Sequence, residues 1–97
     1  MERNAYRKFV RISSRIEDPK LRDEFFDLFL TSKEREDIGQ RVEIVCELLK
    51  GENSQRAIAK KLSTSIAKIT RGSNCLKAVS AKLKDSIKKF SDTSTTN

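Results

Sequence analysis

Apolar residues recur every three or four positions along most of this chain, the spacing that places them on one face of an α-helix. The pattern predicts six helices, over about residues 5–16, 19–30, 32–50, 55–62, 66–78 and 81–90. The two-residue alternation of a β-strand does not occur. We therefore expect an all-α domain over residues 1–90, with 91–97 as a disordered tail.

Short polar side chains mark where these helices begin, because their oxygens accept hydrogen bonds from the N–H groups of a first turn. The predicted starts are Asp18 before Pro19, Thr31 with Glu34 three residues later as a capping box, Ser54, Ser65 and Ser80. Gly51 is expected to end the third helix in a left-handed conformation.

The second and third helices carry most of the predicted core. The apolar face of 19–30 is too wide for a surface helix, so we expect it to be buried on more than one side, including against a second subunit. The third helix has a stripe of apolar residues, Ile38, Val42, Val45, Leu48 and Leu49. The sixth has Leu83, Ile87 and Phe90 on its apolar side.

Residues 54–78 have the pattern of a helix-turn-helix. Ile58 and Leu62 of the first short helix can meet Ile66 and Ile69 of the next. Ala59 is small, as a close helix crossing requires. The turn has Ser63 where glycine is usual, so a positive φ must be reached without glycine.

The charge of the chain divides unevenly. Its net charge is +7, yet residues 1–49 have ten Lys or Arg against eleven Asp or Glu, whereas residues 50–97 have eleven against three. No acidic residue occurs from Asn53 to Lys84. A polyanionic partner such as nucleic acid is favoured over an ordinary solvated surface.

Composition excludes several classes of protein. There is no histidine, and the two cysteines, Cys46 and Cys75, form no metal-binding spacing, so zinc, haem and His-based catalysis have nothing to build on. No phosphate-cradling glycine loop is present, and we expect no enzyme activity. No membrane span or signal peptide is apparent, so a cytoplasmic protein is expected.

The run from Gly39 to Lys77, GQRVEIVCELLKGENSQRAIAKKLSTSIAKITRGSNCLK, resembles the tryptophan repressor family, and ITRGSN is its most specific part. LFLTSKERE, beginning at Leu28, is similar to the family's segment between its second and third helices. The resemblance implies an intertwined homodimer with L-tryptophan as corepressor. Its partner would be a palindromic operator of genes for tryptophan synthesis or uptake.

The resemblance also implies a ligand site. Arg41 and Arg71 match the arginines that sandwich the indole ring, as planar guanidinium groups can. Backbone carbonyls of Leu28 and Leu30 would receive the ligand ammonium, and both side chains are expected in the core. The remaining pocket positions are Thr31, Val45, Gly72 and Cys75. At position 75 the family commonly has serine, and because a thiol is the weaker hydrogen-bonding group, we expect reduced affinity.

Nine residues form the predicted DNA-binding set. They are Gln55, Arg56, Lys60, Lys61, Ile66, Ala67, Lys68, Thr70 and Lys77. Arg56 can make a bidentate contact with guanine, whereas Lys60, Lys61 and Lys77 suit phosphates. Lys68 replaces the family's small polar residue and could alter operator preference.

The expected mechanism is a population shift in which tryptophan favours a DNA-fitting orientation of the recognition helix. Two alternatives stay open at this point. One is a helix-turn-helix regulator on the same scaffold that does not respond to tryptophan. The other is a helical interaction protein whose basic half binds an acidic partner or RNA.

Overall fold

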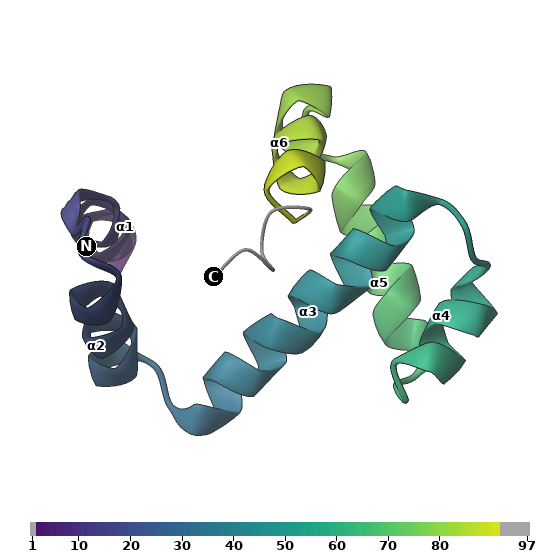
Figure 1. Cartoon of the computed structure of the whole chain (residues 1–97), viewed down its shortest axis with the longest axis horizontal. Coiled ribbons are helices and arrows are strands. Elements are labelled where there is room, and N and C mark those ends of the chain that lie inside the picture. Colours follow the sequence, from purple (N-terminus) through teal and green to yellow (C-terminus); the bar gives the residue numbers. More distant parts are fainter. Residues whose placement is uncertain (1, 92–97) are drawn as a thin grey trace. The chain divides into compact units, whose positions relative to one another are not determined.

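The computed structural model describes residues 2–91, with side chains from residue 4, and every regular element in this range is an α-helix. The helices are α1 (Glu2–Arg15), α2 (Pro19–Phe29), α3 (Ser32–Lys50), α4 (Gln55–Lys61), α5 (Ile66–Lys77) and α6 (Ala81–Ser91) (Figure 1). The six predicted helices are confirmed, although α1 begins three residues earlier than expected. The tail predicted at 91–97 lies outside the described residues except for Ser91, which ends α6.

The chain forms two compact units, one ending at Glu36 and the other beginning at Asp37. In the first unit, α1 and α2 pack through aromatic rings. The ring of Phe9 lies 5.2 Å from that of Phe25 and 5.7 Å from that of Phe29, measured between centroids. Phe25 is the buried centre of this cluster. Arg22 closes the end of α1 by donating two hydrogen bonds to the carbonyl oxygen of Ile16, at 2.9 and 2.6 Å.

Much of the apolar surface of α2 is exposed. Leu21, Phe29 and Leu28 are 53%, 54% and 75% exposed, so the expectation that Leu28 is a core side chain is wrong for a single chain. The reason is that α1 covers only one side of α2 within this unit. The wide apolar face predicted from the sequence is therefore present, but one chain does not bury it.

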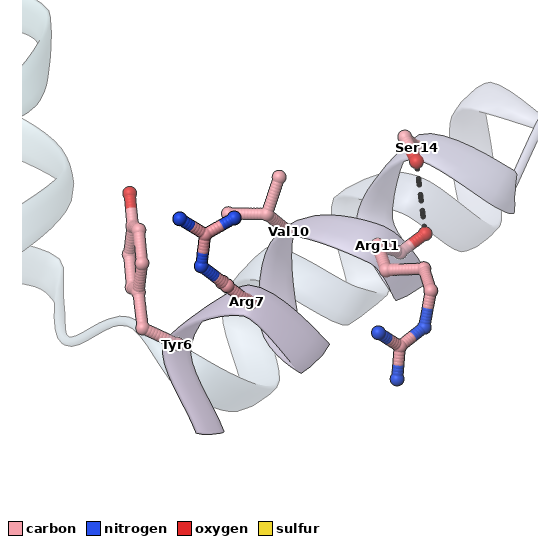
Figure 2. Close-up of a pocket in the computed structure, with 5 residues that line it drawn as sticks. All are labelled: Tyr6, Arg7, Val10, Arg11 and Ser14. Atoms are coloured by element: carbon pink, nitrogen blue, oxygen red, sulfur yellow. Dashed lines mark hydrogen bonds between the residues drawn. The ribbon is translucent and has the colours of Figure 1, made fainter. Parts of the chain in front are cut away.

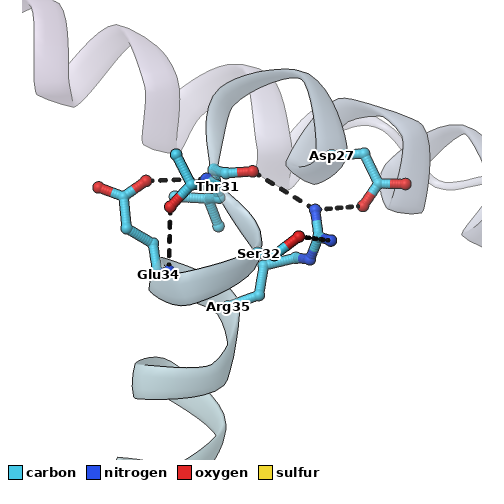
Figure 3. A network of polar contacts seen from close by, with 6 residues as sticks. Asp27, Thr31, Ser32, Glu34 and Arg35 are labelled. Carbon is cyan, nitrogen blue, oxygen red and sulfur yellow. Dashed lines mark hydrogen bonds and ion pairs between the residues drawn. The ribbon is translucent and has the colours of Figure 1, made fainter.

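The start of α3 is fixed by the predicted capping box (Figure 3). The Thr31 hydroxyl accepts a hydrogen bond from the Glu34 amide at 3.1 Å, and a Glu34 carboxylate oxygen accepts one from the Thr31 amide at 2.9 Å. Beside the box, Arg35 forms an ion pair with Asp27 of α2 at 2.9 Å. Two orphan amides are satisfied reciprocally, and the ion pair links α3 to the end of α2.

The core of the second unit lies where α3, α4 and α5 meet. Ile44, Ile58, Ala59 and Ile69 are buried, with Leu48 and Leu62 packed against them. The predicted meeting of the two short helices is confirmed for Ile58 and Ile69, which are fully buried, but not for Ile66, which is 48% exposed.

The buried face of α3 differs from the predicted stripe. Ile38 and Val42 are 44% and 51% exposed, whereas Ile44 is only 3% exposed. The stripe follows from helical spacing alone, and the position of α5 selects a face rotated toward Ile44 and Glu47.

The connections of the second unit follow the sequence closely. Gly51 ends α3 at a φ of +67°, and Ser63 in the turn between α4 and α5 has a φ of +53°, so a serine occupies the left-handed region there. The hydroxyls of Ser54, Ser65 and Ser80 accept hydrogen bonds from the amides of Ala57, Lys68 and Leu83, at 3.1, 3.2 and 3.1 Å. All three predicted serine caps are confirmed.

The sixth helix is amphipathic but not covered. Leu83 and Phe90 are 47% and 64% exposed, and Ile87 is half-buried, so the apolar side predicted for α6 lies largely at the surface of the single chain. No helix among residues 2–91 has the length and apolar character needed to cross a membrane.

Candidate functional site

Helices α4 and α5 form a compact pair joined by an apolar contact and a polar one. Ile58 and Ile69 have no exposed surface and belong to one core cluster. At the surface, the Thr70 hydroxyl donates a hydrogen bond to the Gln55 side-chain oxygen at 2.9 Å. Two residues of the predicted DNA-binding set therefore contact each other, one from α4 and one from α5.

The outer surface of this pair is basic. The exposed members of the predicted DNA-binding set are Arg56, Lys60, Lys61, Ile66, Ala67, Lys68, Thr70 and Lys77, and Gln55 is half-buried. Ser65 caps α5, so Ile66, Ala67 and Lys68 occupy its first turn. Exposed donors at the N-terminus of a helix are suited to approach a phosphate-lined groove.

Among residues 4–91, Lys61 is the one member of this set whose side chain pairs with a carboxylate. Its ammonium lies 2.9 Å from an oxygen of Glu47 on α3. The Glu47 residue is 7% exposed, and Lys50 contacts the same oxygen at 3.5 Å. The hydrogen bond from Lys61 lowers the pKa of Glu47, and the same bond raises the pKa of Lys61.

Helix α5 also packs closely on α3, through Gly72. A Cβ on Gly72 would lie 3.0 Å from Cγ2 of Ile44 and 3.5 Å from Cδ1 of Leu48. One turn earlier on α5, the Lys68 ammonium donates a hydrogen bond to the Gln40 side-chain oxygen at 3.2 Å. Both contacts join α5 to α3.

The two predicted ligand arginines fall between these contacts. Arg41 follows Gln40 on α3, and Arg71 precedes Gly72 on α5, so each lies next to a residue that joins the two helices. Both side chains are exposed, and in the part of the chain that the structure describes, neither forms an ion pair with a carboxylate. Two unpaired guanidinium groups are available to a ligand here.

The other predicted ligand residues divide between the two units. Val45 and Gly72 are half-buried and Cys75 is exposed, all in the second unit with the arginines. Leu28, Leu30 and Thr31 belong to the first unit. The Leu30 carbonyl accepts a hydrogen bond from Arg35 at 3.4 Å, and the Thr31 amide and hydroxyl both serve the capping box.

Three residues that shape this region are absent from the predicted sets. Ile44 supplies the surface under Gly72, Gln40 holds Lys68, and Glu47 holds Lys61. A sequence signal exists only for Glu47, an acidic residue among apolar neighbours on α3. Gln40 and Ile44 fit the helical pattern of α3, so nothing in the sequence distinguishes them from their neighbours.

A shallow pocket on the first unit contains no predicted site residue. Figure 2 shows that it is lined by Tyr6, Arg7, Val10, Arg11 and Ser14, all from α1. The Ser14 hydroxyl in it bonds back to the Arg11 carbonyl at 2.9 Å. Within the described residues, no group of three His, Cys, Asp or Glu side chains could hold a metal ion.

Comparisons with known proteins show the family of this chain. The family model described as Trp repressor protein matches residues 4–91. A Trp operon repressor homolog of Chlamydia trachomatis serovar D is 40% identical over 69 residues, covering 71% of this chain and 73% of the relative. A homolog of the same description in Chlamydia caviae is 44% identical over 67 residues, which cover 69% of this chain and 66% of the relative. Another in Vibrio vulnificus strain YJ016 is 43% identical over 69 residues, which cover 71% of this chain and 68% of the relative. The chain therefore belongs to the Trp repressor family, whose members are transcriptional repressors.

Proposed function

We propose that this protein represses transcription as a homodimer that binds a palindromic operator when L-tryptophan is bound. The observation that carries the proposal is the double role of α5. Its first turn exposes Lys68 and neighbouring residues, while Gly72 seats the helix on α3 beside Arg41. One helix can thus face DNA and line a ligand site.

On the DNA side, the exposed residues of α5 contact mainly the bases, and those of α4 contact mainly the DNA phosphates. Ile66, Ala67, Lys68 and Thr70 enter the major groove, and Arg56 makes a bidentate contact with guanine. Lys60 and Lys77 contact phosphates, which add affinity and salt dependence but no sequence information. Two copies related by a two-fold axis require half-sites about one helical turn apart.

On the ligand side, the Arg41 and Arg71 guanidinium groups stack on the two faces of the indole ring, and Arg71 pairs with the carboxylate. Val45, Gly72 and Cys75 of the same unit line the pocket beside the arginines. Support for the arginine roles comes from their places next to Gln40 and Gly72, which join α3 and α5, and from their lack of carboxylate partners within residues 4–91.

The homodimer accounts for apolar surface that one chain leaves open. Tyr6, Leu21, Leu28 and Phe29 of the first unit are all more than half exposed, which is costly for large apolar side chains in water. A second copy of the chain covers this surface.

Tryptophan acts on a pre-existing equilibrium of the α4–α5 pair. The ligand binds the DNA-fitting orientation better and so raises its population. Because such coupling is reciprocal, operator DNA must tighten tryptophan binding by the same factor by which tryptophan tightens DNA binding.

The test combines two measurements. The chain has no Trp, so the fluorescence of added L-tryptophan reports its binding directly. Selection from a random duplex pool, with and without L-tryptophan, reports DNA specificity. We expect a fluorescence change that Arg71→Leu abolishes, and recovery of palindromes only when tryptophan is present.

Two results would contradict parts of this proposal. Palindromes recovered equally without tryptophan, with no fluorescence change, would establish a tryptophan-independent regulator. Failure to recover any common sequence would remove the operator-binding role altogether.

A further inference from the structure

Lys61 differs from the other basic residues of α4 because it forms an ion pair with Glu47. Glu47 is 7% exposed and lies on α3, outside the acid-free stretch that contains α4 and α5. One of its carboxylate oxygens accepts from Lys61 at 2.9 Å and from Lys50 at 3.5 Å. The other oxygen is enclosed and has no hydrogen-bond partner in the structure.

A carboxylate buried in this way is costly unless it is paired, so its position depends on Lys61. The reverse also holds. Lys61 directs its ammonium at α3, while its neighbour Lys60 is exposed and forms no ion pair among the described residues. Adjacent lysines on one short helix therefore have different environments.

The pair matters because α4 has only seven residues, too few for a stable helix on its own. It is held to α3 by the buried Ile58 and Ala59 and by Lys61 in its last turn. It is held to α5 by the Ile58–Ile69 core and by the Gln55–Thr70 hydrogen bond. Contacts that hold α4 on α3 therefore also influence the direction of α5, together with the direct contact of Gly72 with Ile44.

We propose that Glu47 and Lys61 are positioning residues that hold α4 on α3 and so set the orientation of α5, and that Lys61 is not a phosphate contact. This inference rests on the proposed DNA-binding function and reassigns one residue of the predicted DNA-binding set.

The variant Glu47→Gln distinguishes a role in net charge from a role in positioning, because the two predict opposite changes in DNA affinity. Glu47→Gln removes a negative charge from a basic surface, which by charge alone tightens DNA binding. If Glu47 positions α4, the variant weakens binding instead. A fall in the competent orientation to about a tenth of its population lowers the apparent affinity about tenfold.

The experiment measures affinity for the palindromic duplex selected above, as a function of salt, with tryptophan present. Lys60→Gln is the matched control, and it should flatten the dependence of log K on log salt by about 0.9 for each phosphate that Lys60 neutralises. Lys61→Gln should weaken binding while leaving that slope unchanged. Lys61→Arg, which keeps a donor for Glu47, should restore affinity.

Hydrogen exchange without DNA tests the same inference independently of the proposed function. The α4 amides of Glu47→Gln and Lys61→Gln should exchange several-fold faster than those of Lys60→Gln, because each loses a contact that opposes local opening of α4. If Glu47→Gln does not fold, Lys61→Gln, changed at a half-exposed side chain, carries both measurements.

The inference is overturned if Lys61→Gln flattens the salt slope as Lys60→Gln does, if Glu47→Gln tightens binding, or if α4 exchange is unchanged. A wild-type protein that binds no duplex would remove the proposed function instead, and the exchange experiment would still decide whether the pair holds α4.

Discussion

Gly72 on α5 lies so close to Ile44 on α3 that a single added carbon would stand 3.0 Å from the Cγ2 methyl group of Ile44. Ile44 cannot easily move away, because it is 3% exposed and packed in the core with Ile58 and Ile69. A side chain at position 72 would therefore require a tightly packed Ile44 to shift by a few tenths of an ångström, whatever ligand binds beside it.

Gly72→Ala should destabilise the protein even though alanine favours helix. The helical gain is about 1 kcal/mol, whereas overpacking a tight core contact costs about 1–3 kcal/mol. We expect a net loss of roughly 1 kcal/mol in urea unfolding at fixed protein concentration. Gly39→Ala is the matched control, since nothing lies within 4 Å of its added Cβ, and it should gain about 0.5–1 kcal/mol. Equal gains at both sites would refute the packing argument.

Ser63→Gly should stabilise the turn between α4 and α5. Ser63 has a φ of +53°, where a side chain is strained and glycine is not. After the entropy that glycine adds to the unfolded chain, a gain of roughly 0.5 kcal/mol remains. In the control, Ser65→Gly changes a cap with a φ of −81° and should lose a few tenths of a kcal/mol. Thermal unfolding of both variants measures this, and a loss at position 63 would contradict the prediction.

The ion pair between Glu47 and Lys61 should make stability depend on pH at both extremes. The pKa of Glu47 is lowered from its usual 4.5, so its contribution is present above pH 4.5 and is lost as pH falls through the lowered pKa. The pKa of Lys61 is raised from its usual 10.5, so its contribution is present below pH 10.5 and is lost as pH rises through the raised pKa.

The groups facing this pair are Lys50 near Glu47, and Glu52 and Glu43 near Lys61. Urea unfolding of wild type and Glu47→Gln from about pH 3 to about pH 7 measures the acidic limb. The stability difference should be constant near neutral pH and shrink below pH 4.5. A difference that stays constant down to the most acidic point would show that the carboxylate charge does not stabilise the fold.

Cys75→Ser should tighten tryptophan binding. A hydroxyl is the better hydrogen-bonding group for the ligand amino group, and Cys75 is exposed on α5 one turn after Arg71. An improved hydrogen bond of about 1 kcal/mol corresponds to roughly a fivefold gain in affinity. Titration of L-tryptophan fluorescence measures it. Cys46→Ser, on α3, should leave the affinity unchanged, and an unchanged affinity for Cys75→Ser would place position 75 outside the ligand contacts.

The sequence by itself determined the elements that depend on neighbouring residues. Asp18, Ser54, Ser65 and Ser80 cap the helices as predicted, and the Thr31 box opens α3, because each bond joins groups two or three residues apart. The acid-free basic stretch is also evident from the sequence, as is the serine at position 63 of the turn, where glycine is usual. Such features need no knowledge of how helices pack.

Only the tertiary structure decided which helical faces are buried and which charges are engaged. Helical spacing permits several adjacent faces of α3, and contact with α4 and α5 selected the one containing Ile44 and Glu47. The same contact separated Lys61 from Lys60, which the sequence presents as equivalent. Burial and ion pairing join residues far apart in the chain, so their outcome depends on the angle and distance between helices, which local spacing does not specify.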